Sequence, residues 1–354
     1  MKNNILKIIL ILILNLFIQN ICYPNQFNFD VTEIEITENG NKFIGKKRGL
    51  ITTDDGIEID ANQFEYDKKL NILNAKGNVK ISDNINKYII YTDKVIYYKN
   101  DEKIFTQNNS KGIDLNNDTI IKANAFEYDL SFNILSAKGN VYLEDKEEDY
   151  KLRSEFLKYF KNDEKIATKG NTTADIKSKY NIKSKDITFL RDEMEISSNN
   201  NTIITDKLNL YNLSKFKYLI NIEELRGEKI TISSNYKTPK SDNFYFSSAI
   251  INLKNQNFIA KNTEIKVHKD IFDNSENDPR LKGVSSSKEG EITTVNKGVF
   301  TSCKINNNCP AWAIQASEIK HDKKKQEINY KNAILKVFNI PVLYFPNFFI
   351  PTRQ

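Results

Sequence analysis

The sequence predicts an all-β protein, an elongated stack of repeated and bent antiparallel strands. Three observations lead to this prediction: a pattern that repeats about every 31 residues, alternation of apolar and polar residues within each copy, and the absence of proline between Pro24 and Pro239. Alternation with period 2 is typical of strands that bury one face. A stretch without proline fits strands whose backbone N–H groups are nearly all needed for pairing.

The first 22 residues are predicted to be a secretory signal peptide. Lys2 and Lys7 precede an apolar stretch, residues 8–18, that only Asn15 interrupts. A positive segment followed by a short apolar one is typical of export signals, and a membrane helix needs about 20 apolar residues. An uncleaved N-terminal anchor is the alternative. We expect the mature chain outside the cytoplasm, where cysteines can oxidise.

Residues 31–270 contain the repeats, which are clearest in residues 59–84 and 121–146. These read IDANQFEYDKKLNILNAKGNVKISDN and IKANAFEYDLSFNILSAKGNVYLEDK at an offset of 62 residues, and half that offset also aligns the chain with itself. The pattern predicts two strands in every 31 residues, joined by polar turns. Glycine inside a strand, as at Gly77 and Gly139, predicts a bend or a close approach of the opposite wall.

One face of these strands is apolar, so its side chains are expected to line one continuous surface. They either close on one another as a dry core or form a trough for long acyl chains, in which each buried CH₂ contributes about 0.8 kcal/mol. Periodicity alone does not distinguish the two. The candidate lipid-lining residues are Phe64, Tyr66, Leu73, Val79, Val95, Tyr97, Phe126, Tyr128, Leu135 and Val141.

Both ends of the repeat region carry features of their own. Residues 28–36 alternate like an edge strand, which either invites pairing with another sheet or is covered. Residues 271–282 are predicted to be a polar loop, and residues 283–351 the last strands and a junction segment. Residues 330–351 are very apolar and aromatic, with prolines at a spacing of five that argue against an ordinary central strand. Such an end suits a continuing chain or a membrane interface.

The repeated motif A-x-x-F-E-Y-D followed by N-I-L-x-A-K-G-N-V resembles the OstA family of lipopolysaccharide (LPS) assembly and bridge proteins. Residues 298–351, with G-V-F-T-S-C, C-P-A-W-A-I-Q-A-S-E-I-K-H-D and F-N-I-P-V-L-Y-F-P-N-F-F-I-P, resemble the segment that leads to the barrel in the LPS-assembly members. The resemblance covers roughly residues 40–351. It implies a folded-over β-jellyroll, or β-taco, at the periplasmic face of the outer membrane.

The same resemblance implies a function and partners. The domain would receive LPS from a periplasmic bridge protein, through sheet-edge pairing, and pass it to a transmembrane barrel that an outer-membrane lipoprotein plugs. The family's long barrel has no counterpart after Pro351, so we expect a fragment or a truncated chain. The family pattern also suggests disulfides from this region to the barrel; without the barrel, a Cys303–Cys309 bridge is the fallback.

The sequence shows no catalytic or cofactor-binding constellation, and we expect no enzyme, cofactor or metal. His268 lies beside no nucleophile motif, His321 occupies an aromatic position of the repeat, and residues 145–149 are expected to be a solvated hairpin tip. Two cysteines with one nearby histidine fall short of a zinc site. The charge of +6, from 52 basic and 46 acidic residues, is spread along the chain and does not call for nucleic acid.

The sequence therefore predicts a passive lipid-conducting domain. The alternatives are a structural or adhesive exported β-solenoid with a dry core, and an LPS bridge protein without a barrel. The segment from Cys303 to Pro351 favours the lipid-conducting domain, because neither alternative needs an aromatic, proline-punctuated end beside cysteines.

Overall fold

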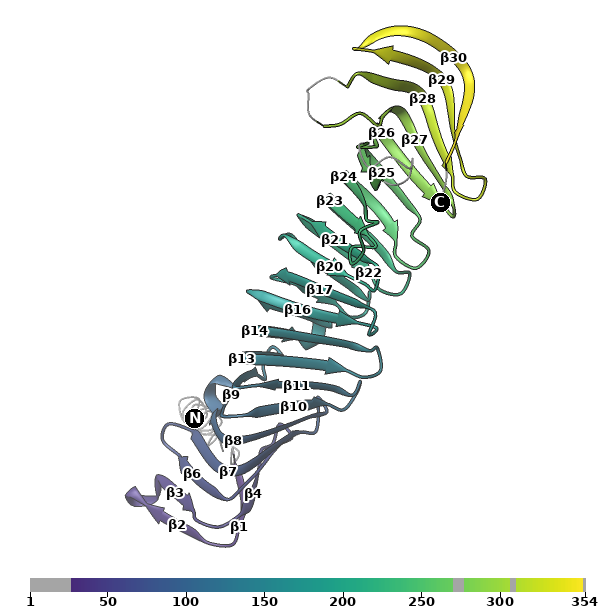
Figure 1. Ribbon diagram of the computed structural model, residues 1–354. Coiled ribbons are helices and arrows are strands. Elements are labelled where there is room, and N and C mark those ends of the chain that lie inside the picture. Colours follow the sequence, from purple (N-terminus) through teal and green to yellow (C-terminus); the bar gives the residue numbers. More distant parts are fainter. Residues whose placement is uncertain (1–26, 270–276, 306–309, 353–354) are drawn as a thin grey trace, which may run out of the picture. The chain divides into compact units, whose positions relative to one another are not determined.

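The computed structural model describes residues 27–269, 277–305 and 310–352, and these ranges consist almost entirely of antiparallel strands (Figure 1). The all-β prediction is confirmed. The chain divides into two compact units, the first ending at Asp101 and the second beginning at Glu102. The predicted signal peptide lies outside the described residues. None of the described helices has the length and apolar character needed to cross a membrane.

The first unit contains eight strands and two 3-10 turns. Its elements are β1 (Asn28–Val31), β2 (Ile34–Thr37), η1 (Glu38–Gly40), β3 (Lys42–Gly45), β4 (Gly49–Thr52), β5 (Ile57–Ala61), β6 (Gln63–Asp67), β7 (Ile72–Asp83), β8 (Tyr88–Tyr98) and η2 (Lys99–Asp101).

The second unit contains β9 to β30, which follow one another in chain order in Figure 1. Its first elements are β9 (Lys103–Gln107), β10 (Ser110–Asp114), β11 (Thr119–Ala123), β12 (Ala125–Asp129), β13 (Ile134–Asp145), β14 (Tyr150–Phe160), η3 (Lys161–Asp163), β15 (Lys165–Lys169), β16 (Asn171–Ile176), β17 (Tyr180–Lys185), β18 (Thr188–Leu190), β19 (Glu195–Ser198), β20 (Thr202–Thr205), β21 (Asn209–Leu213) and β22 (Lys215–Leu219). Longer strands complete it: β23 (Glu224–Ser234), β24 (Asp242–Asn252), β25 (Phe258–Lys266), β26 (Arg280–Glu289), β27 (Ile292–Thr301), β28 (Trp312–Asp322), β29 (Glu327–Val337) and β30 (Ile340–Pro351).

Each passage of the chain across a unit is made by one long strand or by two short strands in succession. The long strand β13 pairs with β12 over its first half and with β11 over its second half. In the first unit, β7 pairs in the same way with β6 and β5. Two such passages fit into each 31-residue repeat. The sequence predicted two strands there, and the structure divides some of them into two short strands.

In the long strands β7 and β13, the bend occurs where the sequence places glycine. Gly139 has φ +77°, and the register between β13 and β14 shifts between Lys138 and Val141. Gly77 has φ +81°, and β7 shifts against β8 in the same way. A backbone with positive φ suits glycine because it has no Cβ. The bend prediction is confirmed at both positions.

Replacing Gly139 by alanine is expected to destabilise the second unit by about 1–3 kcal/mol, the range for a strained non-glycine backbone. An added Cβ would also lie 2.5 Å from Nδ2 of Asn124, the residue that links β11 and β12. Gly170→Ala is the matched control, because its φ is +83° but no atom lies within 4 Å of an added Cβ. Urea unfolding followed by circular dichroism should show the larger loss for Gly139→Ala; equal losses would mean that contact with Asn124 is unimportant.

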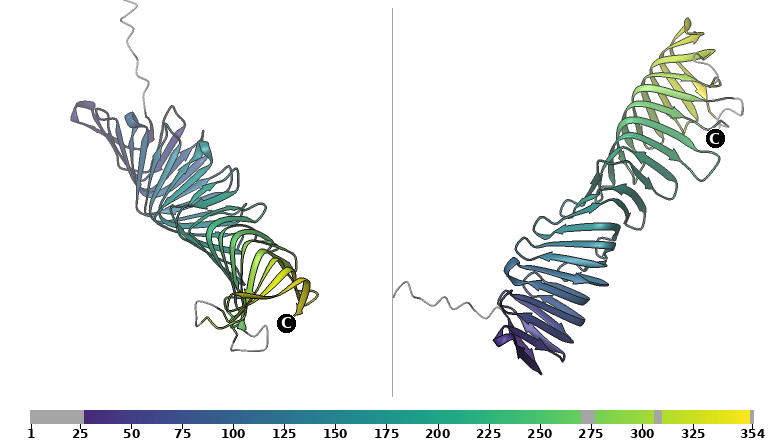
Figure 2. Two further views of the ribbon diagram at one scale, coloured as in Figure 1. Left: turned by 90° about the horizontal axis from the view of Figure 1, so that it is seen from above. Right: turned by 90° about the vertical axis from the view of Figure 1, so that its left-hand side faces the viewer.

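The bends divide the second unit into two walls, and each wall ends in a row of turns (Figure 2). The first row of turns contains residues 115–118, 146–149, 177–179, 206–208 and 235–241. The second row contains residues 130–133, 161–164, 191–194, 220–223, 253–257, 290–291 and 323–326. We call the gap between the two rows the mouth. Every passage of the chain, whether one long strand or two short ones, therefore runs between the mouth's two sides by way of the bend.

The C-terminal strands continue this arrangement. Strand β26 begins at Arg280, three residues before position 283, where the sequence predicted strands to resume, and residues 270–276 lie outside the described residues. The last strand, β30, pairs on one side with β29. It includes Pro341, Pro346 and Pro351, which suit an edge strand because proline cannot donate to a second neighbour.

Candidate functional site

The predicted lipid-lining residues all lie in the interior of their units. Those in the first unit are Phe64, Tyr66, Leu73, Val79, Val95 and Tyr97, and those in the second are Phe126, Tyr128, Leu135 and Val141; each is at most 8% exposed. The rings of Phe27 and Tyr66 lie 4.9 Å apart, and those of Phe27 and Tyr97 lie 5.7 Å apart. Phe27 thus packs against two of the predicted lining residues, and the role of the whole set toward lipid stays a prediction.

In the second unit, strand pairing aligns one inward residue of each passage into a continuous row, which we call the inner row. It lies near the second row of turns, and successive members are direct cross-strand partners. Its members are Ile104, Tyr128, Leu135, Tyr159, Ile166, Phe189, Ile196, Tyr218, Leu225, Ile251, Phe258, Lys288, Thr293, His321, Ile328 and Ile350.

A cavity of about 440 Å³ opens between the walls and is lined mainly by residues of β23 to β28. Its apolar lining comes from inward side chains of both walls. Strands β24, β25 and β27 each contribute a phenylalanine to it. The apolar residues are Leu208, Ile232, Phe244, Ile251, Phe258, Ile265, Val267, Leu281, Phe300, Ile319 and Ile328. A cavity with such a lining can hold hydrocarbon chains, because burial of apolar surface drives their binding.

Basic side chains border this cavity on the side of the second row of turns. Lys288, Thr293 and His321 are consecutive members of the inner row, and Lys323 lies in the turn after β28. Asp242 is the acidic residue among those that line the described cavity. Its Oδ1 lies 3.0 Å from Nδ1 of His268, so it already has a neighbour on its own side of the mouth.

Burial shifts the pKa of both basic members of the inner row downward. Burial lowers the pKa of Lys288, and the positive charge of Lys323 lowers it further. Burial likewise lowers the pKa of His321, and Lys323 again adds to the effect. Among the described residues, neither side chain has an ion pair or a hydrogen bond. A bound anion would favour the charged form of both.

Ion pairs close the mouth in an earlier part of the second unit. Arg191, in the second row of turns, lies 2.6 Å from Asp145 at the end of β13 in the first wall, and 3.0 Å from Glu164. Lys161 lies 2.6 Å from Asp114 across the same gap. Burial lowers the pKa of Arg191, but the nearby tyrosines and carboxylates raise it more, so the net shift is upward.

The position of Asp145 corrects one expectation. The sequence predicted a solvated hairpin tip for residues 145–149, but Asp145 is 1% exposed and only the residues after it form the turn. Its burial follows from the ion pair with Arg191. A signal for such residues exists in the sequence: Asp83, Asp114 and Asp145 recur at 31-residue intervals, and all three are buried.

Further contacts join the two sides of the mouth in the second unit, and a comparable ion pair occurs in the first unit. In the second unit, Glu223 accepts hydrogen bonds from Lys179 at 2.6 Å and from the Tyr180 hydroxyl at 2.7 Å. Burial raises the pKa of the Glu223 carboxyl, but these two donors lower it more, so the net shift is downward. In the first unit, Lys99 pairs with Asp55. In the second unit, the mouth is thus bridged at several points between Asp114 and Glu223, and we call this stretch the latched part of the second unit.

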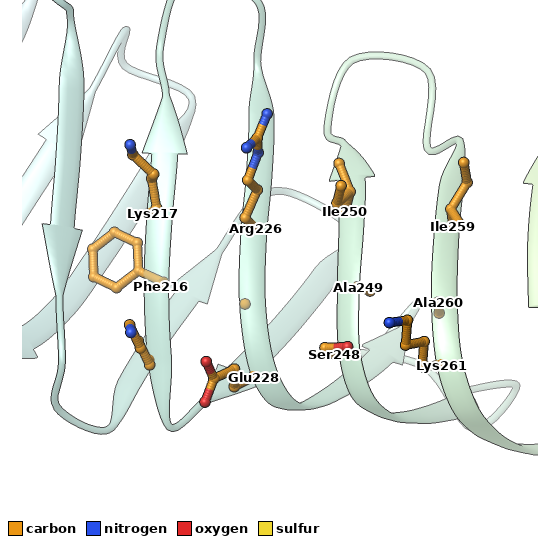
Figure 3. Close-up of a pocket in the computed structure, with 12 residues that line it drawn as sticks. Phe216, Lys217, Arg226, Glu228, Ser248, Ala249, Ile250, Ile259, Ala260 and Lys261 are labelled. Atoms are coloured by element: carbon orange, nitrogen blue, oxygen red, sulfur yellow. The ribbon is translucent and has the colours of Figure 1, made fainter. Parts of the chain in front are cut away.

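A second hollow, of about 370 Å³, lies on the outer face of β22 to β25 (Figure 3). Figure 3 shows Lys217 and Arg226 beside Ile250 and Ile259, with Glu228 on the opposite side of the hollow. Gly227, Ala249 and Ala260 also line it. Its charged border makes it less suited to hydrocarbon chains than the cavity between the walls.

The remaining predicted features have mixed outcomes. Cys303 Sγ lies 3.6 Å from the Trp312 carbonyl oxygen, but Cys309 lies outside the described residues, so the disulfide stays a prediction. His321 occupies the inner row, as expected for an aromatic position of the repeat. It also borders the cavity, which the sequence did not predict. Sequence reasoning missed Lys288, Lys323 and the cavity itself, because their proximity depends on which passages pair.

Comparison with known proteins confirms the resemblance to LPS-assembly proteins. The chain is similar to LPS-assembly protein LptD of Vibrio cholerae, with 24% identity over 156 residues, 41% of this chain and 20% of that protein. It is also similar to the LptD proteins of Yersinia pestis and Xanthomonas oryzae, each 33% identical over 63 residues, 18% of this chain and 8% of theirs. The chain thus spans a fifth or less of the length of these relatives.

No protein-family model matches the chain. Among solved structures it aligns with LptH of Pseudomonas aeruginosa, described as the LptA-homologous periplasmic component of the lipopolysaccharide transport device. That alignment has 12% identity and a TM-score of 0.29, and it covers 33% of this chain and 87% of LptH.

Proposed function

We propose that this chain conducts lipopolysaccharide in the periplasm, holding the acyl chains between its two walls. The cavity lined by residues of β23 to β28 is the observation that carries the proposal, because it offers an apolar interior with a polar border. The names of the relatives support the choice of lipid. The role is transport rather than catalysis: the lipid is bound along an apolar surface and no bond is changed.

The proposal includes an exported location and partners. A periplasmic bridge protein would deliver the lipid by pairing with an edge strand of the first unit, where β1 pairs with β4 and β2 pairs with β3. Ile34 and Ile36 of β2 are 39% and 59% exposed, which suits a partner strand. The lipid would then pass toward the outer membrane. A lipoprotein plug for a barrel remains a prediction from the resemblance.

Photocrosslinking tests this function directly. A photoreactive residue at Phe258, which is 7% exposed and lines the cavity, should form adducts with purified LPS after irradiation of the full chain. The neighbouring Ile259 is 69% exposed on the outer face and is the matched control. We expect adducts at Phe258 and at most traces at Ile259, read as a mobility shift on a gel probed for LPS.

The opposite result would favour the structural alternative. The burial of the predicted lining residues, including Phe126 and Leu135, is also compatible with an exported solenoid that needs no lipid. Absence of adducts at Phe258 and at Phe300 in a folded chain would contradict lipid conduction. Adducts at Leu135 as well would extend the lipid path into the latched part of the second unit.

A further inference from the structure

The inner row changes character at one place, and this place borders the cavity. From Ile104 to Phe258 every member is apolar or a tyrosine, and the row is apolar again at Ile328 and Ile350. Lys288, Thr293 and His321 interrupt it on three adjacent strands, β26, β27 and β28. These strands lie side by side in Figure 1. Direct cross-strand partners have Cβ atoms about 4.5–5.5 Å apart, so the three side chains form one cluster.

Among the described residues, Lys288, His321 and Lys323 form no ion pair. Lys288 is partly buried, and Lys323 brings another positive charge within electrostatic range of both Lys288 and His321. The acidic groups nearby are Glu291, Asp322 and Asp242. Asp242 accepts hydrogen bonds from the His268 backbone, and Asp322 from the Lys325 backbone. Partly buried cations without a paired anion are unfavourable in the empty protein, which points to a ligand that supplies the negative charge.

Resting on the proposed function, we propose that Lys288, Thr293, His321 and Lys323 form a binding site for the phosphate of a lipid headgroup. The acyl chains of that lipid would occupy the adjacent cavity. Lys288 and Lys323 supply positive charge, while the Thr293 hydroxyl and the His321 ring supply hydrogen-bond donors. Charge complementarity therefore selects an anionic lipid, and the apolar lining next to the cluster requires that the anion carry hydrocarbon chains.

The site gives the cavity a direction. An apolar lining alone binds hydrocarbon at many positions with similar affinity, so it fixes no position for the headgroup. A phosphate site on the second row of turns would hold the headgroup at that side of the mouth, with the chains pointing toward the bend. Lipid would then pause at β26 to β28 rather than slide past them.

Two fluorescent lipids with identical acyl chains test the proposal on the purified full chain. Phosphatidic acid carries the phosphate, and diacylglycerol lacks it. We expect wild-type protein to bind phosphatidic acid at least tenfold more tightly than diacylglycerol. The variant with Lys288→Gln and Lys323→Gln should bind both lipids about equally, with its affinity for diacylglycerol unchanged.

Matched variants guard against loss of folding or of general charge. Lys254→Gln with Lys324→Gln removes two exposed charges from the second row of turns and should keep the tenfold preference. Lys288→Arg keeps the charge at the site and should also keep the preference. Circular dichroism spectra of all variants should superimpose on that of the wild type.

The outcomes separate this inference from the proposed function. If wild-type protein binds both lipids equally, the phosphate site is wrong but the lipid-binding cavity stands. If it binds neither lipid, the proposed function fails with it. If millimolar inorganic phosphate binds at Lys288 as tightly as phosphatidic acid does, the site serves free phosphate and the assignment to a lipid headgroup is overturned.

Discussion

Arg191→Met is expected to lower the free energy of opening of the latched part of the second unit by about 3–5 kcal/mol. This is the range for removing one partner of a buried ion pair, since the other partner is left buried without compensation. Asp145 is the group left behind: its side chain is 1% exposed, and that of Arg191 is 9% exposed. Glu164 and the Tyr159 hydroxyl lose hydrogen bonds of 3.0 and 2.7 Å from the same guanidinium.

Native-state hydrogen exchange of the amides in β13 and β14 measures this loss where it occurs. Arg153→Met is the matched control, because Arg153 pairs with Asp175 at 3.0 Å but their side chains are 55% and 36% exposed. Exposed pairs contribute about 0–1 kcal/mol, so the control should change exchange little. Equal effects of the two substitutions would show that the ion pair of Arg191 does not hold the mouth closed.

Phe126→Ala is expected to destabilise the lipid-free second unit by about 3–5 kcal/mol, the range for removing a buried phenylalanine ring. Phe126 is 2% exposed, and its ring lies beneath Gly112 of β10, where an added Cβ would be 3.5 Å from it. The loss arises because the ring has close neighbours without any ligand. The prediction therefore distinguishes a packed interior from an open trough.

Phe132→Ala serves as the control, since Phe132 is 67% exposed in the turn between β12 and β13. That substitution should alter stability by less than about 0.5 kcal/mol. Urea unfolding of both variants without lipid gives the comparison. If Phe126→Ala lowers the free energy of unfolding no more than Phe132→Ala does, the Phe126 ring faces empty or solvent-filled space. That result would favour the trough interpretation over the dry core.

Local pattern was enough to predict much of the fold. Alternation identified the buried face of the strands, and positions such as Phe64 and Leu135 are buried as expected for period 2. Glycines inside strands identified the bends at Gly77 and Gly139. Both features depend on residues close in sequence, so a single sequence contains the information.

Asparagine carried a signal that the sequence analysis did not use. Asn71, Asn78, Asn133 and Asn140 have φ between +48° and +57°, and they occur at turns and bends of successive repeats. Asparagine adopts this left-handed conformation more readily than most residues other than glycine. Its repeated spacing could have located both the turns and the bends more completely.

The latches and the cavity could not be predicted in the same way. Arg191 and Asp145 are 46 residues apart, and their contact depends on how the second row of turns meets the first wall. The inner-row cluster depends on the register that brings Lys288 beside Thr293 and His321. Neither the Arg191–Asp145 contact nor the cluster leaves a pattern among residues close in sequence. Each can be identified only when the pairing of the passages is known.

The serial pairing of strands in the second unit has a consequence for how that unit loses its structure. From β23 to β29 each strand pairs with the strand before it and the strand after it, so no central element contacts all the others. Arrays of this kind melt in segments, with cooperativity limited to neighbours. Trp312, the sole tryptophan of the chain, reports only on β27 to β29. Its fluorescence transition should therefore differ from the circular dichroism transition, and a single melting temperature will not describe the chain.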